Sequence, residues 1–214
     1  MSVLPIYLYG SEALRAKAKP VNELDNSIVK LIYDMFETMH KANGIGLAAT
    51  QVGSLHRVIV IDVSEVEEKK DEETGETIQV ASPGLPRKLV MINPRVVSEA
   101  GLWKMEEGCL SIPEVRGEIE RAEKIGIRFL DANFRETELL ADGLLARVML
   151  HEIDHLDGVL FIDRVSATDR ALLRTQLRKI KKGEVETSYP VITSSDPARP
   201  MGSGGRRRSR KVEV

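Results

Sequence analysis

The sequence predicts a single domain that combines α-helices with β-strands, and three observations support this fold class. The chain has 214 residues, enough to bury one substantial core. Hydrophobic residues make up 42% and charged residues 30% of it, as in ordinary globular proteins. Three stretches have helical periodicity, whereas five are rich in the branched and apolar residues of strands. We therefore expect one domain over residues 1–183, large enough to carry an active site.

The three helices are predicted from apolar residues spaced three and four positions apart. They cover residues 25–43, 142–158 and 167–182. Asp25 is one of three adjacent residues that can cap the first helix, and Asp142 can cap the second. On the third helix we expect one apolar side, formed by Leu172, Leu173, Leu177 and Ile180.

The five strands are expected at residues 57–63, 89–92, 96–98, 125–130 and 136–140. Two other segments have a different composition. Residues 64–88 are charged and then rich in proline and glycine, which predicts a surface insertion without a core role. Residues 184–214 are polar and end in GSGGRRRSRKVEV, which predicts a disordered basic tail.

Charge and cysteine content restrict the partners and the compartment. The formal net charge of −2 gives no general attraction to nucleic acid, so we expect no specific DNA partner. No apolar stretch is long enough to cross a bilayer, and the first ten residues lack the pattern of a secretory signal. The single cysteine, Cys109, excludes an internal disulfide framework and fits a reducing compartment. We expect a cytoplasmic protein with no membrane partner.

The segment His151-Glu152-Ile153-Asp154-His155 is the strongest functional signal. Positions four apart share one helix face, so His151 and His155 can bind the same metal ion. Glu152 can then reach the open side of that ion, as in the H-E-x-x-H pattern of metal hydrolases. The alternative is a packed histidine pair with Glu152 and Asp154 as surface charges.

The third metal ligand is expected upstream of this helix. A common extension of the pattern needs a histidine at position 161, where this chain has Phe161. The first glutamate downstream is Glu184, in the basic C-terminal region. Cys109 can supply a thiolate, giving a Cys/His/His set with a fourth position for water. Considered without the histidines, Cys109 would more often be a small buried residue or a nucleophile.

Three segments together resemble the signature motifs of the peptide deformylase family. They are GIGLAATQ at residues 44–51, EGCLS at residues 107–111 and HEIDH at residues 151–155. They occur in the family's order and at compatible separations, and the resemblance extends over residues 3–165. It implies an α+β fold, with antiparallel or mixed strands around the helix that bears the H-E-x-x-H motif.

The resemblance also implies an activity and its cofactor. Family members remove the formyl group from N-terminal formyl-methionine of nascent chains and release formate. They typically use Fe(II), and Zn(II), Ni(II) or Co(II) also suit a site with sulfur and nitrogen ligands. By the same resemblance, the Gln51 amide and the backbone N–H of Leu110 stabilise the oxyanion, and Arg116 lies near the substrate. A surface role explains Arg116 nearly as well.

Elementary chemistry agrees with this assignment. A divalent ion held by one thiolate and two imidazoles lowers the pKa of a bound water, and Glu152 can accept and later deliver a proton. Gly44 and Gly46 permit close approach to an extended peptide. Ile45, Val148 and Leu110 are candidates for the wall of an apolar pocket that takes the methionine side chain.

Other functions are considered beside this one. A metalloprotease is disfavoured by the missing histidine at position 161. A ribosome-associated relative without activity is disfavoured because Glu152, Cys109 and Gln51 are all present. A purely structural or redox metal site leaves Glu152 unexplained. The basic residues of the third helix and of the tail can bind ribosomal RNA phosphates, and a solvated helix with a disordered tail explains them equally well.

Overall fold

The computed structural model describes residues 2–66, 69–70, 77–78, 80–194 and 196. Within these residues it contains three α-helices, α1 (Asn26–Lys41), α2 (Gly143–Leu156) and α3 (Ala167–Lys181). Three short 3-10 helices lie at Glu12–Arg15, Ala49–Val52 and Phe161–Asp163. The strands are β1 (Ile6–Tyr7), β2 (Gly46–Ala48), β3 (Val58–Asp62), β4 (Lys69–Lys70), β5 (Thr77–Ile78), β6 (Lys88–Ala100), β7 (Trp103–Cys109), β8 (Ile112–Arg121), β9 (Lys124–Leu130), β10 (Glu136–Asp142) and β11 (Val191–Ile192).

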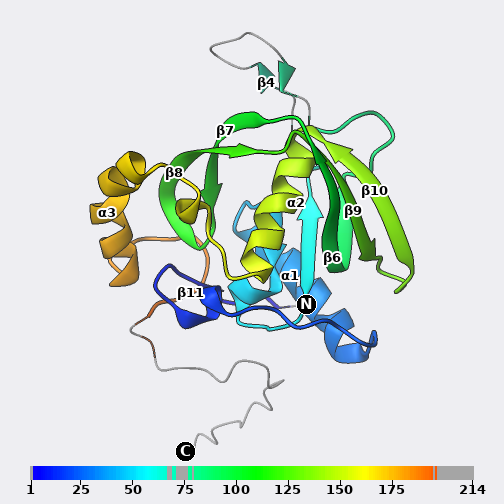
Figure 1. The fold of residues 1–214 in the computed structure, drawn as a ribbon. Helices are drawn as coiled ribbons and strands as arrows, with labels where there is room; N and C mark the ends of the chain where they lie inside the picture. The colour runs from blue at the N-terminus through cyan, green and yellow to red at the C-terminus, as the bar shows by residue number, and fades with distance from the viewer. Residues whose placement is uncertain (1, 67–68, 71–76, 79, 195, 197–214) are drawn as a thin grey trace, which may run out of the picture.

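The main sheet is antiparallel, with the strand order β10-β9-β6-β3-β2. Its strand β3 carries buried apolar side chains on both faces, because α1 packs on one face and α2 on the other. Along β3, Val58 and Val60 share one buried cluster with α1, while Ile59 and Ile61 share another with α2. This alternation follows from the two-residue period of a strand. The sheet therefore holds α2 from one side (Figure 1).

A hairpin of β7 and β8 lies on the other side of α2 (Figure 1). Its strands join through the two-residue turn Leu110–Ser111. Along β8, alternate residues are buried, and Ile112, Val115 and Ile119 pack with Leu177 and Ile180 of α3. The helix α2 is thus enclosed between the sheet and the hairpin, which confirms an α+β domain built around the H-E-x-x-H helix.

The helix predictions agree with the structure except at Asp142 and Leu172. Asp142 precedes α2, but its side chain makes no capping hydrogen bond within the described residues and accepts one from the backbone N–H of Ser82 at 2.9 Å instead. Asp25 caps α1 by accepting hydrogen bonds from the backbone N–H groups of Ser27 and Ile28 at 2.9 and 2.8 Å. The helix α3 covers residues 167–181, with Leu177 and Ile180 buried. The expectation that Leu172 belongs to its apolar side is wrong, because Leu172 is 76% exposed. None of the helices in the described ranges has the length and apolar character needed to cross a membrane.

The segment 64–88 differs from its prediction. Val80 is 1% exposed and Ala81 is also buried. Both belong to the hydrophobic cluster that contains the buried residues of α2, such as Leu145. The backbone N–H of Leu145, in α2, donates to the carbonyl of Val80 at 2.8 Å. The expectation of an insertion without a core role is therefore wrong at these positions. The β4–β5 hairpin of this segment stands apart from the body at the top of Figure 1.

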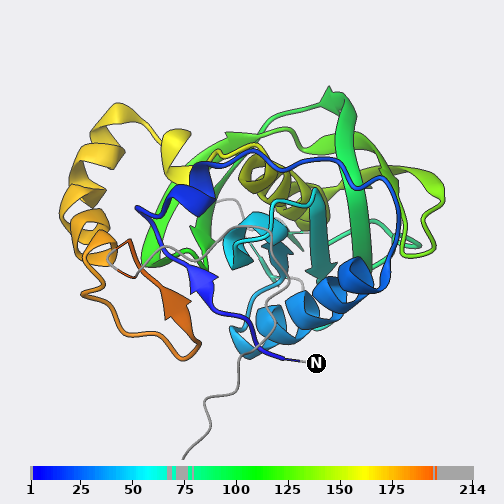
Figure 2. The same ribbon diagram turned by 90° about the horizontal axis from the view of Figure 1, so that it is seen from below.

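The predicted boundary at residue 183 comes too early. The strand β11 pairs in parallel with β1, so the chain beyond α3 returns to the N-terminal segment (Figure 2). Val185 and Val191 also pack on the cluster that includes α3. The sequence did not predict this pairing, because the segment is polar and contains prolines. In addition, the two-residue strand β11 has its partner strand almost the whole chain away. The remainder of the predicted tail, at residue 195 and residues 197–214, lies outside the described residues.

Candidate metal centre and active site

Three ligand-type side chains converge at the centre of the molecule. His151 and His155 lie one turn apart on α2, and Cys109 ends β7. Their ligand atoms all lie within 4.8 Å of one another, and Cys109 Sγ is 3.1 Å from His155 Nε2. Both histidines are buried, whereas Cys109 is partly exposed. Cys109 and His155 are 46 residues apart in the sequence, and the β7–β8 hairpin brings them together by packing against α2.

The donor set fits a divalent metal ion. One sulfur and two imidazole nitrogens are a usual combination for a catalytic site that keeps a coordination position open. His151 Nδ1 lies 2.9 Å from a carboxylate oxygen of Glu107, which leaves Nε2 of that ring available as a ligand. An outer carboxylate of this kind orients metal-binding histidines in many proteins.

Glu107 is the centre of a buried ionic cluster beside the three ligand-type residues. It accepts hydrogen bonds from Arg121 Nε at 2.6 Å and from Arg147 Nη1 at 2.7 Å, in addition to its contact with His151. Burial opposes its ionisation, but the hydrogen bonds and charges of His151 and Arg121 outweigh burial and hold the pKa of Glu107 well below its usual range. Glu107 is therefore a carboxylate at neutral pH.

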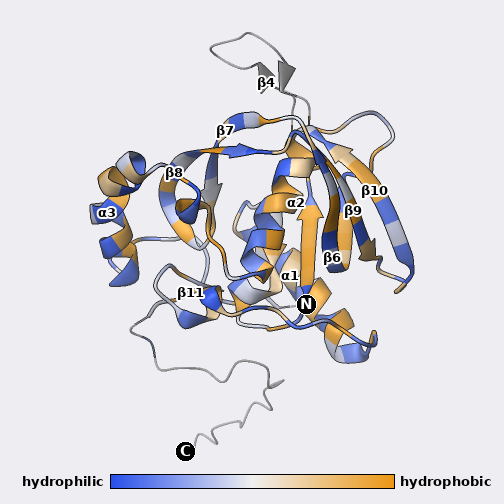
Figure 3. Cartoon of the chain, in the orientation of Figure 1, coloured by the Kyte–Doolittle hydropathy of each residue, from blue (hydrophilic) through white to orange (hydrophobic). Residues whose placement is uncertain are grey.

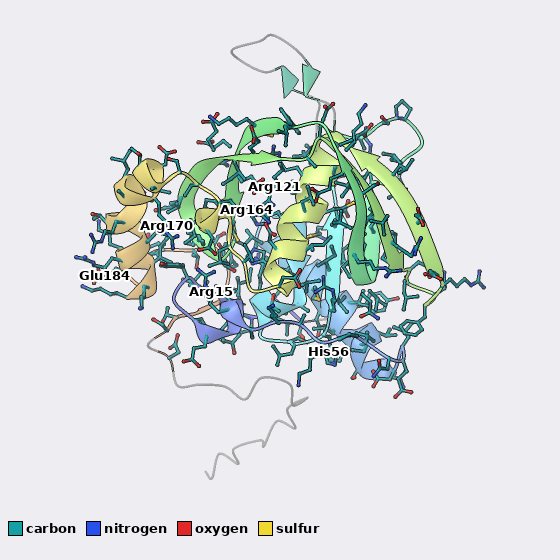
Figure 4. All side chains as sticks on the ribbon, viewed as in Figure 1. Arg15, His56, Arg121, Arg164, Arg170 and Glu184 are labelled. Carbon is teal, nitrogen blue, oxygen red and sulfur yellow. The ribbon has the colours of Figure 1, made fainter. Side chains whose placement is uncertain are left out.

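Asp154 extends this cluster along α2. It accepts hydrogen bonds from Arg121 Nη1 at 2.7 Å and from Arg164 Nε and Nη2 at 2.6 Å each. Arg121 and Arg164 lie together beside α2 in Figure 4. Asp154 is buried, which contradicts the alternative in which it is a surface charge. The cluster ties α2, β8 and the segment after α2 into one rigid unit around the histidines.

Glu152 differs from the other buried carboxylates because one of its oxygens has no partner among the described residues. Oε2 is buried and forms no hydrogen bond with the described residues. Burial raises the pKa of Glu152 to about 7, against the opposing charges of His151 and Arg121. A carboxylate with a pKa near neutrality and a free oxygen can both accept and release a proton.

Gln51 faces the same centre from the 3-10 helix at 49–52. Its Oε1 accepts a hydrogen bond from the backbone N–H of Ala48 at 2.8 Å, which fixes the amide orientation. Its Nε2 then points to Cys109 Sγ at 3.6 Å and to Ser111 Oγ at 3.2 Å. A donor held in this way is ready to stabilise a developing negative charge nearby.

The glycines of residues 44–46 are required by their neighbours. A Cβ at Gly46 would lie 2.5 Å from Glu152 Oε1 and 2.8 Å from Val148 Cγ1. A Cβ at Gly44 would lie 2.7 Å from Leu110 Cδ1. The sequence predicted close approach to a substrate here, and the structure adds close approach of the active-site side chains themselves.

A pocket of about 640 Å³ opens beside these residues. Ten of the eleven site residues expected from the sequence line it, and His155 lies behind Cys109 at its inner end. The ten are Gly44, Ile45, Gly46, Gln51, Cys109, Leu110, Arg116, Val148, His151 and Glu152. Arg116 lies at the exposed rim, 3.7 Å from Glu106.

Sequence reasoning missed several residues of the site. The roles of Glu107, Arg121 and Asp154 were not predicted, because charged residues in a sequence are ordinarily solvated. Arg147, one turn before His151 on α2, is buried against Glu107 and the ring of Trp103. The pocket is also lined by Val66, Val80, Leu144 and Tyr189. For β8, the alternation of charged with uncharged residues from Val115 to Glu120 was a signal in the sequence that could have predicted this strand.

The fold and the site define a class of protein. A Cys/His/His donor set and a buried glutamate on an H-E-x-x-H helix, next to an open pocket, are the elements of a metal-dependent hydrolase. The polypeptide deformylase family matches residues 3–171 of the chain. The chain belongs to the peptide deformylase family, whose members remove the formyl group from nascent peptides.

Similar proteins cover nearly the whole chain. The peptide deformylase of Salinibacter ruber is 47% identical over 92% of this chain and 98% of its own length. That of Chlorobaculum parvum is also 47% identical, over 88% and 94%. Among solved structures, the Ehrlichia chaffeensis peptide deformylase in complex with actinonin has a TM-score of 0.72 and 38% identity, covering 87% of this chain and 100% of that one. The Legionella pneumophila enzyme has a TM-score of 0.71 and 37% identity, covering 86% and 98%.

Proposed function

We propose that the chain hydrolyses the formyl group of N-terminal formyl-methionine with Cys109, His151 and His155 as metal ligands and Glu152 as the proton carrier. One observation carries the assignment: Glu152 is buried next to the three donors with Oε2 unpartnered among the described residues. Such a carboxylate is costly to bury unless the site uses it. A divalent ion supplies a water of lowered pKa and polarises the formyl carbonyl.

The protein groups around the donors have separate tasks. Glu152 accepts the proton of the attacking water and delivers it to the leaving amine nitrogen. The Gln51 amide and the backbone N–H of Leu110 donate hydrogen bonds to the oxyanion that forms at the formyl carbon. The orientation of the Gln51 amide by Ala48 supports this task, because the donor needs no rearrangement during the reaction.

The substrate peptide is proposed to bind along β2. This strand lies at the edge of the main sheet, where Gly44, Ile45 and Gly46 line the pocket. An extended peptide can add to such an edge through backbone hydrogen bonds. The methionine side chain then enters the apolar part of the pocket, next to Ile45, Val148 and Leu110, and Arg116 contacts the peptide at the rim.

We propose Fe(II) as the native metal, with Zn(II), Ni(II) and Co(II) compatible with the same donors. A thiolate with two imidazoles suits all four ions, so availability in the cell decides occupancy. A cytoplasmic location fits both this chemistry and a substrate that emerges from the ribosome.

Formate release tests the proposed reaction. The protein is loaded anaerobically with Fe(II), Co(II), Ni(II) or Zn(II) and given formyl-Met-Ala-Ser, with acetyl-Met-Ala-Ser as the control. We expect metal-dependent formate from the formyl peptide and no acetate from the control. Absence of formate with every metal would refute the assigned reaction, and cleavage of an internal peptide bond would favour a protease instead.

A second proposal concerns the ribosome. On α3, the basic residues Arg170, Arg174, Arg178 and Lys181 line a shallow groove. Hydrophilic colour covers much of this helix in Figure 3. Such a row can bind RNA phosphates, and binding should then weaken steeply with salt. Co-sedimentation with ribosomes at low and high salt tests this: Arg174→Glu/Arg178→Glu should abolish it, and unchanged binding would refute the docking role of α3.

A further inference from the structure

The chain beyond α3 reaches the active site through Tyr189. The backbone N–H of Ile6 donates to the carbonyl of Pro190 at 2.9 Å, and that of Leu8 donates to the carbonyl of Ile192 at 2.8 Å. This pairing of β1 with β11 holds Tyr189 against the hairpin turn. The Tyr189 hydroxyl donates to the backbone carbonyl of Leu110 at 2.8 Å. Tyr189 lies beyond residue 171, where the family match ends.

The carbonyl that Tyr189 binds belongs to a peptide with a second contact. The Leu110 carbonyl and the Ser111 N–H are parts of one planar peptide unit. The Ser111 N–H donates to Cys109 Sγ at 3.4 Å. Because a trans peptide directs its carbonyl and its N–H to opposite sides, a hydrogen bond that fixes the carbonyl also fixes the direction of the N–H. Tyr189 is thereby connected to the thiol in two steps.

The other contacts of this turn hold the groups around the peptide plane: Cys109 pairs with Ile112 across the hairpin, and Gln51 Nε2 donates to Ser111 Oγ at 3.2 Å. The Leu110 side chain lies against Gly44, and the Ser111 carbonyl accepts from the Tyr9 N–H at 2.8 Å. Neither contact involves the Leu110 carbonyl or the Ser111 N–H. Linked hydrogen bonds also polarise one another, so the Tyr189 hydroxyl strengthens the donor that faces Cys109 Sγ.

We propose that Tyr189 is a positioning residue that fixes the Leu110–Ser111 peptide and thereby the Cys109 thiolate. The proposal rests on the role assigned above to Cys109. It gives the C-terminal segment a part in catalysis that the matched region of the family does not include. Tyr189 acts through the turn and needs no contact with the reacting atoms.

Tyr189→Phe tests the proposal, because it removes only the hydroxyl and keeps the ring. Tyr33→Phe is the matched control, since Tyr33 is 55% exposed on α1. Both variants and the parent protein are loaded with Co(II), and the visible and near-ultraviolet bands that report thiolate ligation are recorded. Their kcat and KM for formyl-Met-Ala-Ser and their melting temperatures are measured beside the spectra.

We expect Tyr189→Phe to shift the thiolate-to-cobalt band and to lower kcat about fivefold with KM nearly unchanged, the loss typical of one hydrogen bond. Tyr33→Phe should match the parent in every reading. An unchanged spectrum and kcat would overturn the proposal, even with a lower melting temperature, since Tyr189 would then only stabilise the fold. A rise in KM alone would also overturn it. If the parent released no formate, the reaction assignment would fail, whereas the cobalt band would still decide the role of Tyr189.

Discussion

The helix α2 and the β7–β8 hairpin both contribute residues to the proposed metal centre, but they differ in how the sequence brings those residues together. On α2, His151, Glu152 and His155 lie within five residues, so helical periodicity alone brings the two imidazoles together. On the hairpin, Cys109 and Glu107 reach the histidines only after folding, across 46 and 44 residues of sequence. Local spacing thus determines one half of the site, and long-range packing determines the other.

The difference is also one of environment. Glu152 retains a buried oxygen that has no partner in the part of the chain that the structure describes, whereas Glu107 is held by Arg121, Arg147 and His151. Burial raises the pKa of Glu152 to about 7, while burial is outweighed at Glu107 by the bonds and charges of His151 and Arg121. One carboxylate is therefore equipped to move a proton and the other to stay ionised and orient a ligand.

The largest expected effect is at Glu152. Glu152→Gln keeps the shape of the side chain but removes its basicity, so kcat should fall about a thousandfold while the metal content stays the same. Steady-state formate release and metal analysis on the same preparation check this. Glu184→Gln, at an exposed position, is the control (Figure 4). Retention of more than a tenth of the activity in Glu152→Gln would contradict the proposed proton transfer.

The second-largest effect is expected at Glu107, the hairpin residue whose carboxylate contacts His151 on α2. Glu107→Gln should weaken metal binding about 10- to 100-fold, because His151 loses its carboxylate partner. Competition with a chelator measures the affinity. Glu106→Gln is the neighbouring control, since that side chain is 61% exposed. Equal affinities in the two variants would show that the buried cluster does not orient the histidine.

A smaller effect is expected at the contact between the glycine segment and α2. Gly46→Ala places a Cβ against Glu152 and Val148 and should cost about 1–3 kcal/mol of unfolding free energy. Gly108→Ala should be far milder, because its Cβ would meet only ordinary contacts, the nearest at 3.6 Å. Urea unfolding of both variants provides the comparison. A Gly46→Ala protein as stable as the parent would mean that the side chains around it can move aside.

The smallest effect is expected at Leu172, on the exposed side of α3. Leu172→Ala should change the unfolding free energy by less than about 0.5 kcal/mol, because Leu172 is exposed. Leu177→Ala, on the buried side of the same helix, should cost about 2–5 kcal/mol. Thermal or urea unfolding distinguishes them. A large loss from Leu172→Ala would restore the apolar side predicted from the sequence.

The distinction between local spacing and long-range packing also explains which elements the sequence could predict. The three helices, and strands near 57–63, 125–130 and 136–140, follow from local periodicity and agree with the structure. The two strands expected at 89–92 and 96–98 are parts of one strand, β6, which bends near Asn93 at a φ of 53°. The strand β7 was missed because its buried position is occupied by a charged residue, Glu107, whose partners lie on other elements.

The candidate site follows the same rule. The motif residues were found because each motif is contiguous in sequence. Arg121, Asp154 and Tyr189 were not found, because each acquires its role from partners on other elements, between 10 and 79 residues away. Val80 was missed for a related reason: it lies in a polar segment, and only its contact with α2 makes it part of the core.

We propose that the hairpin and the helix together hold one metal ion, and X-ray absorption at the zinc edge of the Zn(II)-loaded protein tests this most directly. We predict one sulfur ligand at about 2.3 Å and two imidazole nitrogens at about 2.0–2.1 Å, with the sulfur lost in Cys109→Ser. A first coordination shell without sulfur in the unaltered protein would contradict the account, because Cys109 would then have no place among the ligands.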